Sequence, residues 1–134
     1  MKKNMKTICI TGAGDGIGRA IAIEMSKHGF NIVCADINIQ NAKKTLEIVE
    51  QNNQIGIAVK ADVTILSDIN AMIDITTDRF GSIDVIVNNA GVTRTSGIME
   101  LNEKDWDWIH NVNAKGTFFC LQIAAKQMIK QNKG

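Results

Sequence analysis

The chain lacks several features that define whole classes of protein. Its 134 residues include no tyrosine and no proline, and only 4% of them are aromatic. The formal net charge is +1, so no strong field favours nucleic acid or an acidic membrane surface. No stretch approaches the roughly 20 apolar residues of a membrane span, and no long apolar run follows the N-terminal lysines as in a signal peptide. We therefore expect a single soluble domain over residues 1–134, with no leader and no binding to nucleic acid or membrane.

The cysteine content is low and lacks any pairing pattern. Cys9, Cys34 and Cys120 all lie inside apolar segments. An odd number of cysteines without paired or metal-type spacing argues against a disulfide framework and against a zinc site. We interpret the three residues as small buried hydrophobes. This predicts no metal ion and a reducing compartment, with the cytoplasm as the default location.

Short apolar runs alternate with segments of helical periodicity. The runs read as strands at Thr7–Ile10, Asn31–Ala35, Ile55–Val59 and Ile83–Val87. Apolar residues at helical spacing lie between them, and Gly29 and Gly81 are expected to end the first and third helices. Continuous apolar strands in this alternation predict an α/β fold, a Rossmann-type doubly wound parallel sheet with strand order 3-2-1-4. Its ligand crevice should lie between strands one and four.

Two further helices are predicted after the fourth strand. Asn102 is expected to cap the first of them, with Asp105 in its first turn. The second should run from about Val112 to Gln131 and is apolar on two faces, so it should pack on its own sheet and on another surface. Trp106 and Trp108 are two residues apart and should face different ways, one into the core and one toward a subunit contact.

A glycine-rich segment, TGAGDGIG at residues 11–18, directly follows the first predicted strand. It has the pattern T-G-x-x-x-G-x-G rather than G-x-G-x-x-G. Glycine can adopt positive φ or let a ligand approach the backbone, and the N–H groups at the start of the next helix attract anions. A plain tight turn is the alternative, but the place between a strand and a helix favours dinucleotide binding. We expect the pyrophosphate region of the ligand to lie against Gly12, Asp15, Gly16, Ile17 and Gly18.

Asp36 ends the second predicted strand and is the candidate acceptor for the adenosine ribose hydroxyls. The alternative is a turn aspartate without a ligand. The charge also selects between cofactors, because the 2′-phosphate of NADP would meet this carboxylate and neither Ile37 nor Asn38 could pair with it. We therefore expect NAD rather than NADP.

Polar residues also follow the third and fourth predicted strands. Asp62 and Val63 are candidates for contact with adenine, although Asp62 could instead be a helix-entry residue. Asn88–Gly91 lies on the far side of the crevice. Its Asn side chains could tie adjacent strand ends together, and Asn89, Ala90 and Gly91 would flank the far ribose. An ordinary turn is the alternative for this segment.

Together these motifs resemble the short-chain dehydrogenase/reductase family. Their order and spacing match over essentially the whole chain, including Asn113 in the segment NVNAKG. The resemblance implies an NAD(P)-dependent oxidoreductase that interconverts a secondary alcohol and a ketone, usually as a homodimer or homotetramer. It also implies that Asn113 is a catalytic residue whose main-chain carbonyl holds a water in a proton relay. The segments 105–108, 111–116 and 118–120 look most like NAD-dependent acetoin/butanediol, sorbitol or glucose dehydrogenases, and 3-oxoacyl carrier-protein reductases share much of the pattern.

The sequence departs from the family downstream of Asn113. The family needs a Ser and a Tyr-x-x-x-Lys pair there, whereas these residues contain no Tyr and no Ser after Ser96. We expect a truncated cofactor-binding part that is inactive alone, since a missing proton step typically costs about 10²–10⁴-fold in rate. The fourth strand should then be an exposed edge, and the final helix should lack its packing partner. The alternatives are a non-catalytic NAD-binding or partner-binding module and a 3-oxoacyl carrier-protein reductase fragment.

Overall fold

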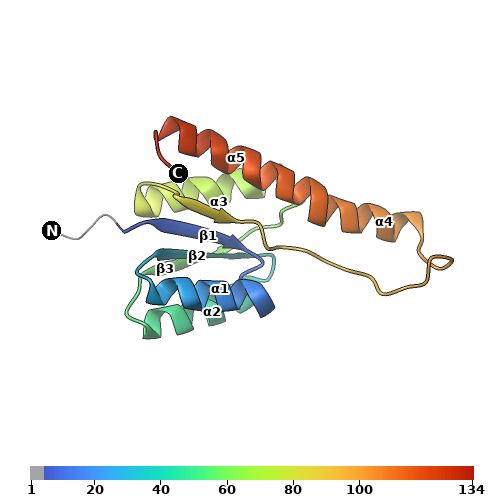
Figure 1. The fold of residues 1–134 in the computed structure, drawn as a ribbon, viewed down its shortest axis with the longest axis horizontal. Coiled ribbons are helices and arrows are strands. Elements are labelled where there is room, and N and C mark those ends of the chain that lie inside the picture. The colour runs from blue at the N-terminus through green and yellow to red at the C-terminus, as the bar shows by residue number, and fades with distance from the viewer. Residues whose placement is uncertain (1–4) are drawn as a thin grey trace.

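The computed structural model describes residues 5–134 and is built around a four-stranded parallel sheet (Figure 1). The strand order is β3-β2-β1-β4, which confirms the predicted doubly wound topology. The strands are β1 (Thr7–Thr11), β2 (Asn31–Asp36), β3 (Gly56–Lys60) and β4 (Val85–Val87). One face of the sheet is covered by α1 (Gly16–Lys27) and α2 (Ile39–Gln51), and the other by α3 (Leu66–Phe80) and α5 (Thr117–Lys130).

Burial on both faces explains why the strands are continuously apolar. Cys9 packs in the core beneath α3 and α5, whereas its neighbours Ile8 and Ile10 pack beneath α1 and α2. Side chains of one strand alternate between the two faces, so both faces of β1 need apolar residues. β1 pairs in register with β2 over its whole length and with β4 over three residues, from Ile8–Val85 to Ile10–Val87.

The strand ends differ slightly from the prediction. β1 and β2 each extend one residue further, to Thr11 and Asp36, and β3 begins at Gly56. β4 is shorter than predicted, since it begins at Val85. Ile83 lies before the strand and is fully buried. The predicted helix ends at Gly29 and Gly81 are confirmed, with φ values of +81° and +82° that only glycine adopts without strain.

The two predicted C-terminal helices form one continuous helical rod. It consists of α4 (Glu103–His110), a π-helical segment η1 (Asn111–Gly116) and α5. The predicted helix from about Val112 to Gln131 is confirmed as η1 and α5, but it continues from α4 without the expected break. Asn102 does cap the rod, since its Oδ1 accepts a hydrogen bond from the Asp105 N–H at 2.9 Å. A π-helical stretch inside an α-helix often marks a functional site.

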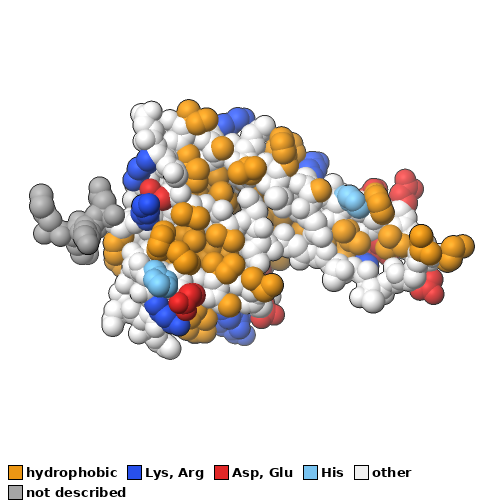
Figure 2. All heavy atoms as spheres, in the orientation of Figure 1, with side chains coloured by type: hydrophobic (Ala, Val, Ile, Leu, Met, Phe, Trp, Pro, Cys, Tyr) orange, Lys and Arg blue, Asp and Glu red, His pale blue; other side chains and the backbone are white. Residues whose placement is uncertain are grey.

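The N-terminal end of this rod projects beyond the sheet (Figure 1). Hydrophobic side chains gather at the projecting end (Figure 2), where Ile98 and Met99 are both 93% exposed. Trp106 is 55% exposed and Trp108 is 41% exposed, so neither tryptophan lies in the core and that expectation is wrong.

α5 packs against its own sheet and α3 through one face, as predicted, so it is not without a packing partner in the described chain. Cys120 and Ala124 are buried in the core that α5 shares with α3. Beyond the end of α5, the Gln131 side chain accepts a hydrogen bond from the Ile83 N–H and donates one to the Ile83 carbonyl. The helix is thereby joined to the segment leading into edge strand β4. Leu121 and Ile129 stay largely exposed on the other side of the helix.

The three cysteines are free and buried, as predicted. Burial raises the pKa of Cys34 to about 12 and the pKa of Cys120 to about 11. Burial, together with the neighbouring Cys120 and Cys34 thiols, raises the pKa of Cys9 above its ordinary value as well. The thiolate is the reactive form, so these thiols are inert in the folded chain.

Within residues 5–134, none of the helices combines the length and the apolar character that crossing a bilayer requires.

Candidate functional site

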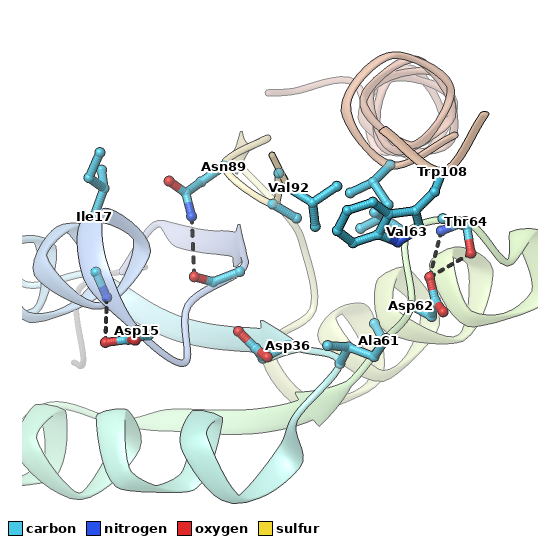
Figure 3. Close-up of a pocket in the computed structure, with 16 residues that line it drawn as sticks. Asp15, Ile17, Asp36, Ala61, Asp62, Val63, Thr64, Asn89, Val92 and Trp108 are labelled. Atoms are coloured by element: carbon cyan, nitrogen blue, oxygen red, sulfur yellow. Dashed lines mark hydrogen bonds between the residues drawn. The ribbon is translucent and has the colours of Figure 1, made fainter. Parts of the chain in front are cut away.

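A cavity of about 640 Å³ opens at the carboxyl edge of the sheet (Figure 3). Its volume lies within the usual range for small-molecule and cofactor sites. The loops after all four strands contribute to it, because the carboxyl ends of parallel strands meet at one edge. Among the residues predicted to bind a cofactor, the lining contains Gly12, Asp15, Gly16, Ile17, Asp36, Asp62, Val63, Asn89, Ala90 and Gly91. Gly18 and Asn113 do not line it.

Gly12 and Gly18 allow the glycine-rich loop to close tightly. Gly12 has φ +64°, and a Cβ there would lie 2.9 Å from Asn89 Nδ2 and 3.0 Å from the Ala90 Cα. A Cβ at Gly18 would overlap the Gly12 carbonyl. Gly18 therefore serves the packing of helix against loop, while Gly12 forms part of the cavity wall.

The N-terminus of α1 provides donors beside the cavity. The Asp15 carboxylate caps the helix by accepting from the Gly16 N–H at 2.8 Å, and the first internal helix bond runs from Arg19 N to Asp15 O. The N–H groups of Ile17 and Gly18 precede that bond; Ile17 lines the cavity, whereas Gly18 is buried behind it. Asp15 places a negative charge at the same end, so the site is less electropositive than the glycine pattern alone indicates.

Two residues that sequence reasoning missed hold the loop from behind. Arg19 donates to the Gly14 carbonyl and, at 3.1 Å, to the Thr45 hydroxyl. The Thr45 hydroxyl in turn donates to the Ala13 carbonyl at 2.8 Å, and this side chain is fully buried on α2. A threonine inside a predicted helix carries no sequence signal for this role, because the contact spans more than thirty positions.

Asp36 binds the loop as well as facing the cavity. Its Oδ2 accepts from the Gly14 N–H and its Oδ1 accepts from the Asn38 N–H, each at 2.8 Å. A carboxylate offers about four acceptor positions, so two stay free for a ligand. The described residues that line this cavity include no Lys, Arg or His, although Lys60 of β3 is the strand partner of Asp36.

Asp62 and Val63 lie at the end of the cavity away from Asp15 and Ile17 (Figure 3). Asp62 Oδ1 accepts from both the N–H and the hydroxyl of Thr64, at 2.9 and 2.7 Å. This is the local turn expected of a helix-entry aspartate, and the same residue also lines the cavity. Val63 is 9% exposed and presents an apolar surface.

Asn89 ties β4 to β1, as expected for an asparagine at this place. Its Nδ2 donates to the carbonyls of Thr11 and Gly12 at 3.0 and 3.2 Å. The Thr11 hydroxyl accepts hydrogen bonds from the N–H groups of Asn89 and Ala90, at 3.1 and 3.0 Å. The four bonds fix the two strand ends on either side of the cavity floor.

Asn113 lies in the π-helical segment, exposed and outside the cavity. Its side-chain amide pairs with the backbone of Val92, accepting from the N–H and donating to the carbonyl at 2.8 Å each. The Asn113 carbonyl accepts from the Thr117 hydroxyl at 2.8 Å. Asn113 thus anchors the loop after β4 to the helical rod. Val92, to which it bonds, is itself part of the cavity lining.

The remaining cavity residues were not predicted. They are Ile37, Ala61, Thr64, Val92, Trp108 and Val112. Most are apolar neighbours of predicted residues, and Trp108 and Val112 share one face of the rod because they are four residues apart. The described part of the chain has no cluster of three or more His, Cys, Asp or Glu that could hold a metal ion.

The fold and the placement of the cavity define a Rossmann-type α/β domain. The model of the family described as short chain dehydrogenase matches residues 6–134, so the chain belongs to that family of oxidoreductases. Members of this family bind nicotinamide cofactors.

Curated relatives include the 3-oxoacyl-(acyl-carrier-protein) reductase FabG of Staphylococcus aureus, 38% identical over 98% of this chain and 54% of that protein. An uncharacterized oxidoreductase of Staphylococcus epidermidis is 39% identical over 99% of this chain and 56% of its own length. Among solved structures, an NAD⁺-bound xylitol dehydrogenase superimposes with a TM-score of 0.93 at 30% identity, covering 100% of this chain and 52% of that one. The chain thus spans about half the length of the relatives it matches.

Proposed function

We propose that the chain is the cofactor-binding part of an NAD-dependent oxidoreductase that interconverts a secondary alcohol and a ketone. The observation that carries the choice of cofactor is Asp36, a carboxylate in a cavity whose lining contains no cationic residue. The likeness to an NAD⁺-bound xylitol dehydrogenase supports the same cofactor and a polyol substrate.

The geometry of the cavity fits a dinucleotide. Gly12 lines the cavity at a place where a Cβ would collide with Asn89 and Ala90, and the N–H groups at the start of α1 would receive the pyrophosphate. Asp36 would accept from the adenosine ribose hydroxyls, Asp62 and Val63 would contact adenine, and the far ribose would lie against Asn89, Ala90 and Gly91. When bound, a nicotinamide cofactor supplies the hydride acceptor or donor.

Proton transfer needs a group that these residues do not contain. We propose that Asn113 takes part in a proton relay through its main-chain carbonyl, as the family resemblance implies. The relay would still lack a phenol, because the 134 residues include no Tyr. Catalysis therefore requires a proton donor from outside residues 1–134, and this polypeptide alone would bind cofactor without turning over substrate.

The choice of cofactor is tested by comparing NAD⁺ and NADP⁺ binding calorimetrically. We expect NAD⁺ to bind about five- to thirtyfold more tightly, since a like charge near the 2′-phosphate costs on the order of 1–2 kcal/mol. Asp36→Asn removes the charge but keeps an acceptor for the Gly14 N–H, and it should narrow the ratio to about threefold or less.

The matched control is Asp78→Asn, which removes the same charge from an exposed position on α3. It should leave the ratio of the two affinities unchanged. Tighter binding of NADP⁺ than NAD⁺ by the unaltered chain would refute the proposed cofactor. An equal effect of both substitutions would show that only net charge matters.

A second candidate is a 3-oxoacyl carrier-protein reductase, favoured by the 38% identity to proteins of that name. Reduction of a 3-oxoacyl thioester, rather than oxidation of a polyol, by a protein that includes this chain would favour the reductase.

For either activity we propose a cytoplasmic enzyme, supported by the three free buried thiols. We also propose a homodimer or homotetramer that uses the exposed Leu121 and Ile129 of α5.

A further inference from the structure

We propose that Trp108 forms the outer wall of the adenine subsite and stacks against the purine base of the bound nucleotide. This inference rests on the proposed function, since it assumes that the cavity receives an adenine nucleotide. It deepens that function by assigning an aromatic contact to a residue that was not predicted to contact the cofactor.

The position of Trp108 on the helical rod directs it to one end of the cavity. Trp108 lies four residues before Val112, so both side chains share a face, and both line the cavity together with Val63. In Figure 3 the indole ring reaches from the rod toward Val63 and Val92. The ring is on the side of Asp62 and Thr64, away from Asp15 and Ile17 at the N-terminus of α1.

The indole is held in place by a charged pair on the same side. The Arg94 guanidinium lies 5.5 Å from the centre of the Trp108 ring, within the range of a cation–π contact. Arg94 Nε in turn lies 3.3 Å from Asp105 Oδ1 on the first turn of α4. Arg94 follows Val92 by two residues, so the loop that borders the cavity also braces the ring.

The chemistry of this end suits a flat heteroaromatic base. Val63 and Val112 supply apolar surface, Asp62 supplies a carboxylate that can accept from an exocyclic amine, and Trp108 supplies a π-face. Trp108 is 41% exposed, which leaves apolar area for a ligand to cover. Pyrophosphate and ribose offer no such flat surface, and the nicotinamide half is assigned to residues 89–91, so the purine base is the part of the ligand that fits this end.

The other tryptophan provides a matched control. Trp106 stacks on His110 with ring centres 4.1 Å apart and does not line the cavity. These are the only tryptophans in the sequence, so each emission signal can be isolated by replacing the other residue with Phe.

The test uses tryptophan fluorescence and calorimetry with NAD⁺, AMP and nicotinamide mononucleotide as probes. In Trp106→Phe, where Trp108 alone emits, NAD⁺ and AMP should quench the emission strongly. In Trp108→Phe the emission of Trp106 should not change although the ligands bind. Trp108→Ala should weaken NAD⁺ and AMP binding about tenfold, as expected for one lost base–aromatic stack. Trp108→Phe should restore most of that affinity, and nicotinamide mononucleotide should bind equally to all variants.

Three results would overturn the inference in distinguishable ways. NAD⁺ binding with unchanged affinity in Trp108→Ala would refute the stacking role and leave the proposed function intact. Equal quenching in Trp106→Phe and Trp108→Phe would show a general change rather than a contact. If the unaltered chain, with its native circular dichroism, binds neither NAD⁺ nor AMP, the proposed function fails together with this inference.

Discussion

Gly12→Ala is expected to lower the affinity for NAD⁺ about a hundredfold and to destabilise the fold by about 2–4 kcal/mol. The added Cβ would lie 2.9 Å from Asn89 Nδ2 and 3.0 Å from the Ala90 Cα, so the loop must move. Overpacking typically costs about 1–3 kcal/mol, and the φ of +64° adds about 1 kcal/mol. A displaced loop would also lose two charge-assisted bonds to phosphate, and about 3 kcal/mol corresponds to roughly a hundredfold in affinity.

Gly29→Ala separates backbone strain from the local contact. Gly29 has φ +81°, but a Cβ there meets nothing within 4 Å. We expect this variant to lose about 1 kcal/mol of stability in urea unfolding and none of its affinity for NAD⁺ in calorimetry. Comparable NAD⁺ affinities in Gly12→Ala and Gly29→Ala would contradict a role for Gly12 in the binding wall.

Thr11→Val is expected to lower the free energy of unfolding by about 1–3 kcal/mol. The substitution keeps the shape of a side chain that is 2% exposed but removes its hydroxyl. That hydroxyl accepts from the N–H groups of Asn89 and Ala90 and donates to the Val87 carbonyl at 3.3 Å. Loss of the hydroxyl leaves the part-buried Ala90 N–H without its partner, which costs about 1–3 kcal/mol, whereas the Asn89 N–H keeps a bond to the Val87 carbonyl at 3.0 Å. Urea unfolding followed by far-UV circular dichroism measures the loss.

Thr11→Ser is the matched variant, because it keeps the hydroxyl and removes only a methyl group. A loss of about 1 kcal/mol is expected from the smaller apolar burial. The loop after β4 lines the cavity, so Thr11→Val should also weaken NAD⁺ binding, while Thr11→Ser should not. If both variants were equally unstable, the methyl contact rather than the two backbone bonds would hold the strand ends together.

The sequence predicts the parts of the site that depend on strand ends. Gly12, Asp36, Asp62 and Asn89 each follow a different apolar run, and the alternation of runs with helices implies parallel strands. Carboxyl ends of parallel strands meet at one edge, so these four residues had to share a crevice. The cysteines were predictable for a similar reason, because they lie within runs that are buried on both faces of the sheet.

Contacts between side chains on separate elements were not predictable in this way. Periodicity indicated the helix after Asn102 and the helix after Val112, but it did not indicate that the π-helical segment joins them. No local sequence feature shows whether a helix breaks or continues at that point. The pairing of Asn113 with Val92 and the bracing of the loop by Arg19 depend on how elements pack, and packing distances are absent from periodicity.

The order of the strands, the edge that carries the crevice and the residues at each strand end follow from the sequence alone, because hydrophobic periodicity and chain handedness leave few topologies. Only the tertiary structure shows that Trp108 lines the cavity. It also shows the hydrogen bonds that join Thr11 to Asn89 and Gln131 to Ile83. Each of these joins segments through particular rotamers and interatomic distances, which only the packing of whole helices and strands against one another sets.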